Sequence, residues 1–231
     1  MIIYGRNPVR EAIRGPRGVR RVWATAGARR EPWLSGLGTA TTAAEPAEIE
    51  RICGSDAHQG VCAEVEAFRY ADADALLAAG PEPLIVALDQ VQDPQNLGAV
   101  ARSAECAGAT GLVLPERRSA EVTPAVCKAS AGAVEHLPVA RVRNLADFLA
   151  EAKRAGLWCY GADQGGQADY LATDLSGPLV LVLGSEGRGL RPRVAGACDA
   201  IVSISLRGHI ESLSVSAAAA VLIFAAAARR Q

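Results

Sequence analysis

Three separated segments of the chain carry residue types that bind ligands or transfer groups. The first contains Asn96 and Arg102, six residues apart in a segment that predicts a helix. The second, residues 184–190, places Glu186 among three glycines directly after an apolar run. The third, residues 212–216, has three serines at the start of an alanine-rich helix. Such hydroxyls either cap the free N–H groups of the helix or bind an anion or polar ligand.

Each segment taken alone also has a structural explanation. Asn96 could cap a helix, Arg102 could form a salt bridge, and serine is a common cap residue. Glycines let the backbone approach a ligand, but the spacing in residues 184–189 is GxxGxG rather than the GxGxxG of dinucleotide sites. A phosphate-binding P-loop is excluded because GK[ST] is absent. A nucleotide-dependent oxidoreductase is therefore disfavoured.

The elements that position these segments alternate between strand and helix from residue 84 onward. Short apolar strands that alternate with helices predict an α/β fold with a mostly parallel sheet, covered on both faces. Ligands bind such sheets at the carboxyl ends of the strands, which points to loops 89–96, 184–191 and 206–214. The predicted strands are 84–88, 111–114, 157–161, 179–184 and 201–206, and the predicted helices are 96–107, 123–130, 145–155 and 212–229.

A smaller α/β unit precedes this alternation. After an apolar start, a helix is expected over residues 7–14, and the next elements are a strand at 19–25, helices at 31–37 and 46–53, and a strand at 60–67. Residues rich in Ala, Asp and Pro then predict a short helix and a linker. We therefore expect an N-terminal domain over 1–70, a linker over 71–82 and a second domain over 83–231.

Composition limits the class of protein. Half of the residues are apolar and 21% are charged, which is typical of a soluble globular protein. The six cysteines form no CxxC pair, so we expect no metal site and no disulfide framework, but reduced thiols in the cytoplasm. The apolar run 215–228 is too short to span a membrane and predicts a buried helix.

Charge is unevenly distributed, although the net charge is only −1. Residues 1–30 contain eight arginines and one acid, whereas residues 31–80 contain two arginines and nine acids. A local basic patch suits binding to a phosphate backbone, but a solvated arginine-rich surface is an equal alternative. Arg191 and Arg193, which flank the second segment, are further candidates for phosphate contacts.

In this order and at this spacing, the three segments resemble the motifs of the SpoU (TrmH-like) branch of the SPOUT RNA 2′-O-methyltransferases. The matching residues are 93–98 through Arg102, then 183–189, then 204–208 through 212–216. Residues 3–9 and 58–61 are similar to the N-terminal substrate-binding domain of the RlmB-type 23S rRNA guanosine-2′-O-methyltransferases. The resemblance covers the whole length of the chain.

The resemblance implies a fold and a reaction that the residue patterns alone do not. The fold would have a C-terminal trefoil knot, a small N-terminal α/β (ribosomal-protein-L30e-like) domain, and a homodimer interface that borders the active site. The reaction would transfer a methyl group from S-adenosylmethionine to a ribose 2′-OH, in a guanosine of 23S rRNA. A tRNA substrate is an alternative within the same chemistry.

The resemblance also assigns roles to residues, with no metal among them. Because guanidinium stays protonated in proteins, we expect Arg102 to bind the adjacent phosphate and stabilise the developing alkoxide rather than act as a base. The implied catalytic residues are Arg102, Asn96, Glu186, Ser212 and Ser214. The implied cofactor-binding residues are Leu183, Gly184, Ile204, Leu206, Gly208 and Leu213, and the RNA-binding residues are Arg6, Arg10, Arg14 and Arg188.

One position departs from the family pattern. The third motif usually reads Ser-Leu-Asn-Val-Ser, and here Ser214 stands in place of the asparagine. A hydroxyl is shorter and offers one donor where a carboxamide offers two. The alternative to an active enzyme is therefore an RNA-binding protein that has lost catalysis.

Overall fold

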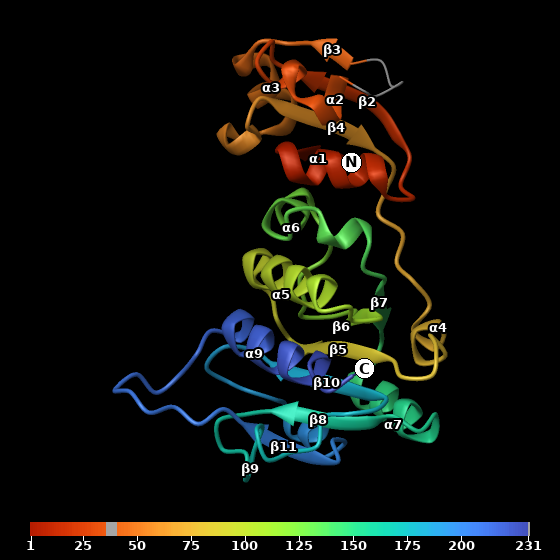
Figure 1. Cartoon of the computed structure of the whole chain (residues 1–231), viewed down its shortest axis with the longest axis vertical. Coiled ribbons are helices and arrows are strands. Elements are labelled where there is room, and N and C mark those ends of the chain that lie inside the picture. The colour runs from red at the N-terminus through yellow and green to blue at the C-terminus, as the bar shows by residue number, and fades with distance from the viewer. Residues whose placement is uncertain (36–40, 231) are drawn as a thin grey trace.

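A computed structural model describes residues 1–35 and 41–230 and contains two separate sheets (Figure 1). The N-terminal sheet has the strand order β1-β4-β2-β3, in which β4 is antiparallel to both β1 and β2, and β3 is parallel to β2. Its elements are β1 (Ile2–Tyr4), α1 (Arg6–Arg14), β2 (Val19–Ala24), η1 (Ala28–Arg30), α2 (Pro32–Ser35), β3 (Thr41–Ala43), α3 (Pro46–Cys53), η2 (Asp56–His58) and β4 (Val61–Val65).

The N-terminal sheet follows the sequence pattern closely. Helix α1 buries Val9 and Ala12 against one sheet face, and α3 buries Ile49 against Cys62 on the other. Of the helix expected over 31–37, the structure has α2, while residues 36 and 37 lie outside the described residues. Strand β3 was not predicted, because a run of three residues is too short to show a period.

The second sheet has seven strands in the order β7-β6-β5-β10-β8-β11-β9, and each of its pairs is parallel. A short helix, α4 (Ala73–Leu77), lies between the two sheets in sequence, as expected for the linker. The remaining elements are β5 (Leu84–Asp89), α5 (Pro94–Cys106), β6 (Gly111–Pro115), α6 (Pro124–Ala129), η3 (Ala133–Glu135), β7 (Val139–Val142), α7 (Leu145–Arg154), β8 (Trp158–Ala162), β9 (Ala168–Asp169), β10 (Leu179–Gly184), α8 (Pro192–Ala195), β11 (Ala200–Ser203) and α9 (Val215–Ala227).

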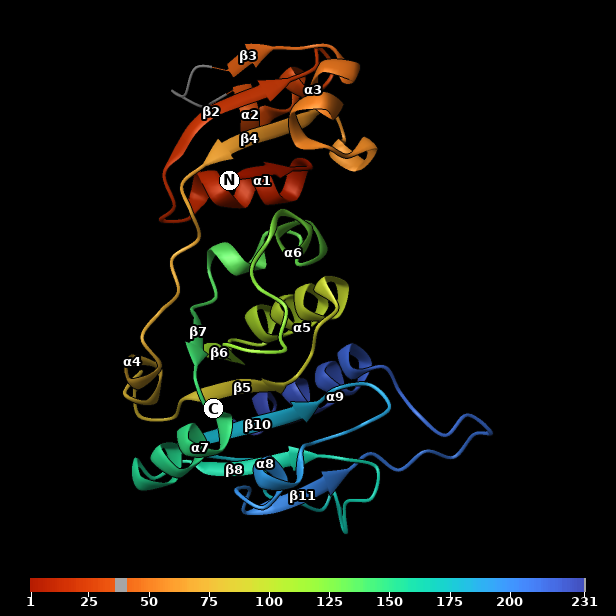
Figure 2. The same ribbon diagram turned by 180° about the vertical axis from the view of Figure 1, so that it is seen from behind.

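Helices cover both faces of this sheet, which confirms the predicted α/β fold. Alternate residues of β5 enter two different cores: Leu84, Val86 and Leu88 pack on the side of α5 and α9, and Ile85 and Ala87 on the side of α7. Figure 2 shows α7 and α8 on the face opposite to α5 and α9. All six residues of β5 are buried, as a parallel strand in the centre of a sheet requires.

The sequence predicted this sheet incompletely. Strands β7 and β9 were missed, since one has four residues and the other two. The strand expected over 201–206 is β11, which ends at Ser203, so residues 204–206 belong to the following loop. The last helix begins at Val215 rather than at Ser212.

Helix α9 is also not buried on all sides, contrary to the prediction. Val221 and Phe224 are 36% and 48% exposed, while Leu222 and Ile223 are fully packed. The exposed side chains form an apolar strip on the outside of α9.

No helix among the described residues is long and apolar enough to cross a membrane.

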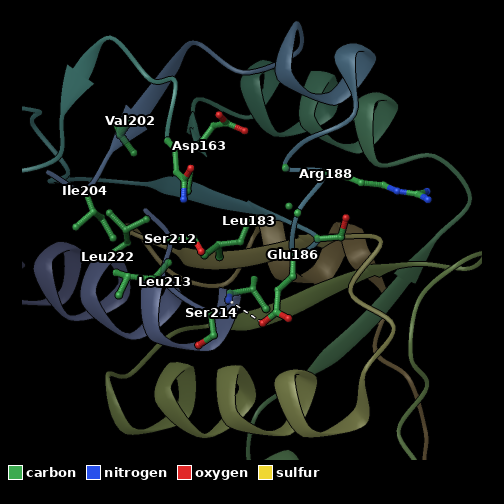
Figure 3. A pocket seen from close by; sticks show the side chains of 18 of the residues that line it. Asp163, Leu183, Glu186, Arg188, Val202, Ile204, Ser212, Leu213, Ser214 and Leu222 are labelled. Atoms are coloured by element: carbon green, nitrogen blue, oxygen red, sulfur yellow. Dashed lines mark hydrogen bonds between the residues drawn. The ribbon is translucent and has the colours of Figure 1, made fainter. Parts of the chain in front are cut away.

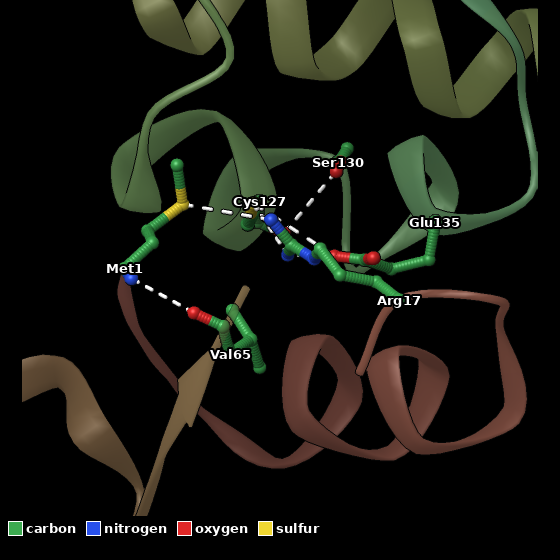
Figure 4. Close-up of polar contacts among 6 residues, drawn as sticks. All are labelled: Met1, Arg17, Val65, Cys127, Ser130 and Glu135. Carbon is green, nitrogen blue, oxygen red and sulfur yellow. Dashed lines mark hydrogen bonds and ion pairs between the residues drawn. The ribbon is translucent and has the colours of Figure 1, made fainter. Parts of the chain in front are cut away.

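A buried ion pair joins the segment after α1, in the N-terminal part of the chain, to η3 in the second part. The guanidinium of Arg17, which follows α1, contacts the carboxylate of Glu135 in η3, and both side chains are almost fully buried. Cys127 of α6 lies against the same guanidinium, and the amino group of Met1 donates to the carbonyl of Val65 (Figure 4). Removing one partner of such a pair costs about 3–5 kcal/mol, so this contact fixes the N-terminal sheet above α6.

Candidate functional site

The order of the strands places a ligand crevice between β5 and β10. The chain moves outward from β5 to β6 and β7, then returns to build the other half of the sheet beyond β10. Ligands of open parallel sheets bind at such a switch point, outside the carboxyl ends of the strands. Two cavities lie there, on either side of Glu186.

The larger cavity measures about 590 Å³ and lies between the loop after β10, the start of α9 and the loop that precedes it (Figure 3). Its volume is within the range of small-molecule sites, which is roughly 300–1,000 Å³. Predicted residues that line it are Leu183, Gly184, Glu186, Arg188, Ile204, Leu206, Ser212, Leu213 and Ser214. Gly208 does not line either cavity, because it lies in the outer part of the loop before α9.

The floor of this cavity is a tightly folded glycine loop. A Cβ atom added at Gly184 would lie 2.1 Å from the backbone carbon of Gly189. Gly189 has φ +62° and its N–H donates to the carbonyl of Ser185 at 3.0 Å. No Cβ fits at Gly184, and Gly189 has a left-handed conformation that favours glycine, so at these two positions the loop presents backbone to the cavity.

A buried carboxylate anchors the end of this loop. Asp89, at the end of β5, is fully buried and accepts hydrogen bonds from the backbone N–H of Arg191 at 2.9 Å and from its Nε at 2.8 Å. Arg193 pairs with Asp147 at 2.9 Å. Arg191 and Arg193 thus each pair with an acid of this chain, and their contacts with phosphates stay a prediction.

Glu186 stands between the two cavities and is held by two donors. Its Oε1 accepts from Asn96 Nδ2 at 3.1 Å and from the backbone N–H of Val215, in the first turn of α9, at 3.3 Å. The smaller cavity, about 280 Å³, lies on the Asn96 side. It is lined by Gln90, Val91, Gln92, Asp93, Asn96, Ser185, Glu186, Arg188 and Val215. One cavity is thus largely apolar and glycine-lined, and the other is polar.

The serines divide their roles differently from the prediction. Ser214, not Ser212, is the N-cap of α9, and its Oγ accepts from the N–H of Ala217 at 3.2 Å. Ser216 Oγ lies 3.1 Å from Ser214 Oγ. Ser212 lies outside the helix, where its side chain lines the larger cavity (Figure 3). The helix begins later than expected because the cap hydroxyl is two residues further along.

Arg102 is the catalytic candidate that the fold does not bring to this site. It is exposed, lines neither cavity, and forms no hydrogen bond or ion pair among the described residues. Six residues of helix advance the chain by about 9 Å and turn it by about 240°. Asn96 therefore faces Glu186 while Arg102 faces solvent on the outer side of α5.

The predicted RNA-binding arginines of α1 form ion pairs with acids. Arg6 lies 2.7 Å from Glu31, and Arg10 and Arg14 both contact Glu11, at 2.7 and 3.3 Å. Burial alone would raise the pKa of the Glu11 carboxyl, but hydrogen bonds from Arg10 and from His136 outweigh it and hold the pKa below its usual value. Part of the local basic charge is thereby neutralised within the chain.

Several residues that line the two cavities were not predicted as site residues, among them Asp163 and Leu222. Asp163 lines the larger cavity, and its Oδ1 accepts from the N–H of Gly165 at 3.0 Å. Leu222 contributes the wall on the side of α9. Asp163 directly follows β8, so the rule that ligands bind at carboxyl ends of strands, applied to that strand as well, would have indicated it.

The loop before α9 extends away from the body of the molecule (Figure 1). Its base is tied by Ser205 Oγ, which donates to Asp169 at 2.5 Å, and its tip exposes Ile210 at 76%. Hydrogen bonds from Ser205 and from the N–H of Leu171 lower the pKa of Asp169. The carboxylate thus stays charged and fixes the start of the loop next to the cavity.

Comparisons with known proteins agree with this geometry. The model of the SpoU rRNA Methylase family matches residues 83–224, and one described as RNA 2′-O ribose methyltransferase substrate binding matches residues 2–71. YacO of Bacillus subtilis, assigned to the TrmH family of tRNA/rRNA methyltransferases, is 44% identical over 72% of this chain and 69% of its own length. A protein of Staphylococcus haemolyticus assigned to the same family is 34% identical over 97% of this chain and 94% of its own.

Solved structures give the same result. The SpoU methyltransferase AviRb of Streptomyces viridochromogenes, in complex with AdoMet, superposes with a TM-score of 0.82 at 26% identity and covers 99% of this chain and 90% of that one. An AdoMet-bound rRNA methyltransferase of Sinorhizobium meliloti has a TM-score of 0.81 at 26% identity, over 97% and 85% of the two chains. On the family match over residues 83–224, and on these relatives, the chain belongs to the SpoU rRNA methylase family.

Proposed function

We propose that the protein transfers the methyl group of S-adenosylmethionine to a ribose 2′-hydroxyl of RNA, in a guanosine of 23S rRNA. The match of residues 2–71 to a 2′-O ribose methyltransferase substrate-binding model supports the ribose as acceptor. Structural neighbours bound to AdoMet support the donor. The likeness of residues 3–9 and 58–61 to RlmB-type enzymes supports the rRNA target, while names of relatives that include both tRNA and rRNA keep tRNA as the alternative.

The observation that carries this proposal is the pair of cavities that meet at Glu186. A methyl transfer between two bound molecules needs two adjoining sites and a fixed line between the reacting atoms. The larger cavity suits the donor and the polar one suits a nucleotide of the acceptor. Glu186 belongs to the walls of both.

The larger cavity fits S-adenosylmethionine in shape and charge. Backbone of residues 184–189 and the side chains of Leu183, Ile204 and Leu213 offer a close-fitting surface for the adenosine. The carboxylate of Asp163 suits one of its positive groups. When bound, the cofactor supplies an electrophilic methyl group, and the protein supplies position and electrostatics.

On the acceptor side, Glu186 has one oxygen in use and one free. Oε1 takes both hydrogen bonds, from Asn96 and Val215, so Oε2 remains available to accept from a ribose hydroxyl in the polar cavity. That hydrogen bond would orient the hydroxyl oxygen toward the donor cavity. Asn96 holds the carboxylate in place and so acts as a positioning residue.

We further propose that Arg102 reaches the site from a second copy of the chain. Ala217, Val221 and Phe224, spaced four and three residues apart, form an exposed apolar strip on α9, and α9 packs against α5, which carries Arg102. An apolar strip on a water-exposed helix suits burial against an identical strip about a two-fold axis. In such a homodimer each Arg102 would approach the partner's polar cavity and bind the phosphate next to the target ribose.

Three finer features of the fold belong to the same proposal. We infer the domain limits 1–70 and 83–231 with the linker between them, and an N-terminal domain of the ribosomal-protein-L30e-like kind. We also infer the C-terminal trefoil knot. Its support is the match of residues 83–224 to the SpoU family model.

Mapping of 2′-O-methylation on rRNA and tRNA, from cells with and without the gene, tests the substrate. A 23S rRNA guanosine that loses its methyl group without the gene supports the proposal. Loss at a tRNA position supports the alternative substrate. An unchanged map, together with S-adenosylmethionine-independent RNA binding by the purified protein, would identify a non-catalytic RNA-binding protein.

A further inference from the structure

Exposed arginines lie on both sides of the polar cavity. Arg117 and Arg118 are in the loop between β6 and α6, and Arg188 is in the loop after β10. Within residues 1–35 and 41–230, the side chains of these three arginines form no ion pair or hydrogen bond. Arg6 and Arg14 of the N-terminal patch, in contrast, are paired with acids. The unpaired cationic charge next to the site thus comes from the second sheet.

Hydrogen bonds fix the Arg117–Arg118 loop to the loop that forms the cavity wall. The N–H of Ala120 donates to the carbonyl of Val91 at 2.9 Å, and Gln92 Nε2 donates to the carbonyl of Arg118 at 3.4 Å. Val91 and Gln92 both line the polar cavity. Because β6 is adjacent to β5 in the sheet, the two arginines lie at the same edge as Asn96.

Two non-glycine residues at this edge of the sheet have left-handed backbone conformations. Arg118 has φ +57° and Gln90 has φ +62°, both in the left-handed region that non-glycine residues rarely adopt. Residues with such backbone conformations cluster at sites that hold ligands. The hydrogen bond from Gln92 to the Arg118 carbonyl ties this turn to the cavity wall.

The loop between β6 and α6 contains two arginines and two acids, and one of those acids pairs with an arginine outside the loop. Glu121 is 3.0 Å from Arg141 and is thus already neutralised. Glu116 is the one remaining acid between β6 and α6, against two arginines. An extended chain of negative charges complements a line of arginines that crosses a polar cavity.

We infer that Arg117 and Arg118 bind phosphates of the RNA acceptor strand on one side of the target nucleotide, and that Arg188 binds a phosphate on the other side. The inference rests on the proposed function, because it takes the polar cavity as the place of the target ribose. The RNA-binding surface would then include the loops after β6 and β10 of the second sheet, separate from the N-terminal arginines.

The test measures binding of labelled poly(U) RNA to the full chain across a range of salt concentrations. Replacing both Arg117 and Arg118 by Gln should weaken binding and make the slope of log affinity against log salt shallower by about 0.7 for each lost phosphate contact. Lysine at both positions should preserve the slope, since an ammonium retains the charge. The matched control is Arg154→Gln, an exposed arginine on α7 at the opposite face, which should leave the slope unchanged.

Three results would overturn the inference: an unchanged slope in the double Gln variant, an equal change in Arg154→Gln, or weaker binding of S-adenosylmethionine by the double Gln variant. The affinity of each variant for S-adenosylmethionine, measured by calorimetry, should equal that of the wild type, and a loss there would also count against a pure RNA role. Because poly(U) binding needs no methyl transfer, a wild type that methylates no RNA would overturn the proposed function without affecting this readout.

Discussion

The side-chain amide of Asn96 donates a hydrogen bond to Glu186 Oε1 at 3.1 Å, across 90 residues of sequence. This contact joins the start of α5, after β5, to the glycine loop after β10, and so bridges the switch point of the sheet. The same oxygen accepts from the N–H of Val215 at the start of α9. Three segments that are far apart in the chain therefore meet at one carboxylate.

Replacing Glu186 by Gln should abolish most methyl transfer while leaving S-adenosylmethionine binding almost intact. We expect a loss of roughly a hundredfold or more in kcat, the size seen when one preorganised electrostatic group is removed. Asn96→Ala should cost about tenfold, since one hydrogen bond to a charged group is lost and the Val215 N–H still holds the carboxylate. Equal losses in the two variants, measured with a methyl-labelled donor, would contradict this ranking.

Gly184→Ala should weaken S-adenosylmethionine binding by tenfold or more, because the new Cβ would lie 2.1 Å from backbone of Gly189. Forcing extra volume into a packed site costs about 1–3 kcal/mol. Gly208→Ala is the matched control: no heavy atom lies within 4 Å of its added Cβ. Calorimetry should find the control equal to the wild type, and a comparable loss in both variants would show that the cavity is not the cofactor site.

Ser214→Ala should lower the free energy of unfolding by about 1 kcal/mol, the usual cost of losing a helix N-cap. Ser212→Ala should change it little, because Ser212 lies outside α9 and caps nothing. Urea unfolding of both variants measures the difference. If Ser212→Ala were the more destabilising of the two, the helix would begin where the sequence first indicated.

Arg102→Ala and Glu186→Gln should each be inactive alone but complement each other within one dimer. A heterodimer, purified by two different tags after co-expression, combines one intact Glu186 site with one intact Arg102. We expect about half of the wild-type activity per dimer, since one of two symmetry-related sites is restored. An inactive heterodimer, or a wild-type protein that is monomeric by light scattering, would place the action of Arg102 within its own chain or outside catalysis.

Much of the fold could be predicted because its strands are short, continuous apolar runs. Strands β5 and β10 are such runs, and each is followed by polar or glycine residues that mark its carboxyl end. Two of the three predicted loops consequently supply Asn96 and Glu186 to one site. Strand β7 was missed because its four residues include Arg141, whose charge interrupts the apolar run.

The remaining differences depend on contacts that sequence does not record. The charges of Arg10 and Arg14 can be counted in the sequence, but the ion pairs that both form with Glu11 cannot be predicted from it. Sequence alone also does not show that Arg191 pairs with the buried carboxylate of Asp89. The orientation of Arg102 away from Asn96 follows from helical geometry, which turns the chain by about 240° over six residues.

The position of the transferred methyl group tests the central claim most directly. The wild-type protein would be incubated with S-adenosylmethionine carrying a deuterated methyl group and with unmodified 23S rRNA, and the RNA digested to nucleosides for tandem mass spectrometry. Fragmentation separates base from ribose, and we predict the label on the ribose fragment of guanosine, absent with Glu186→Gln. A label on the base fragment would contradict ribose 2′-O-methylation at this site.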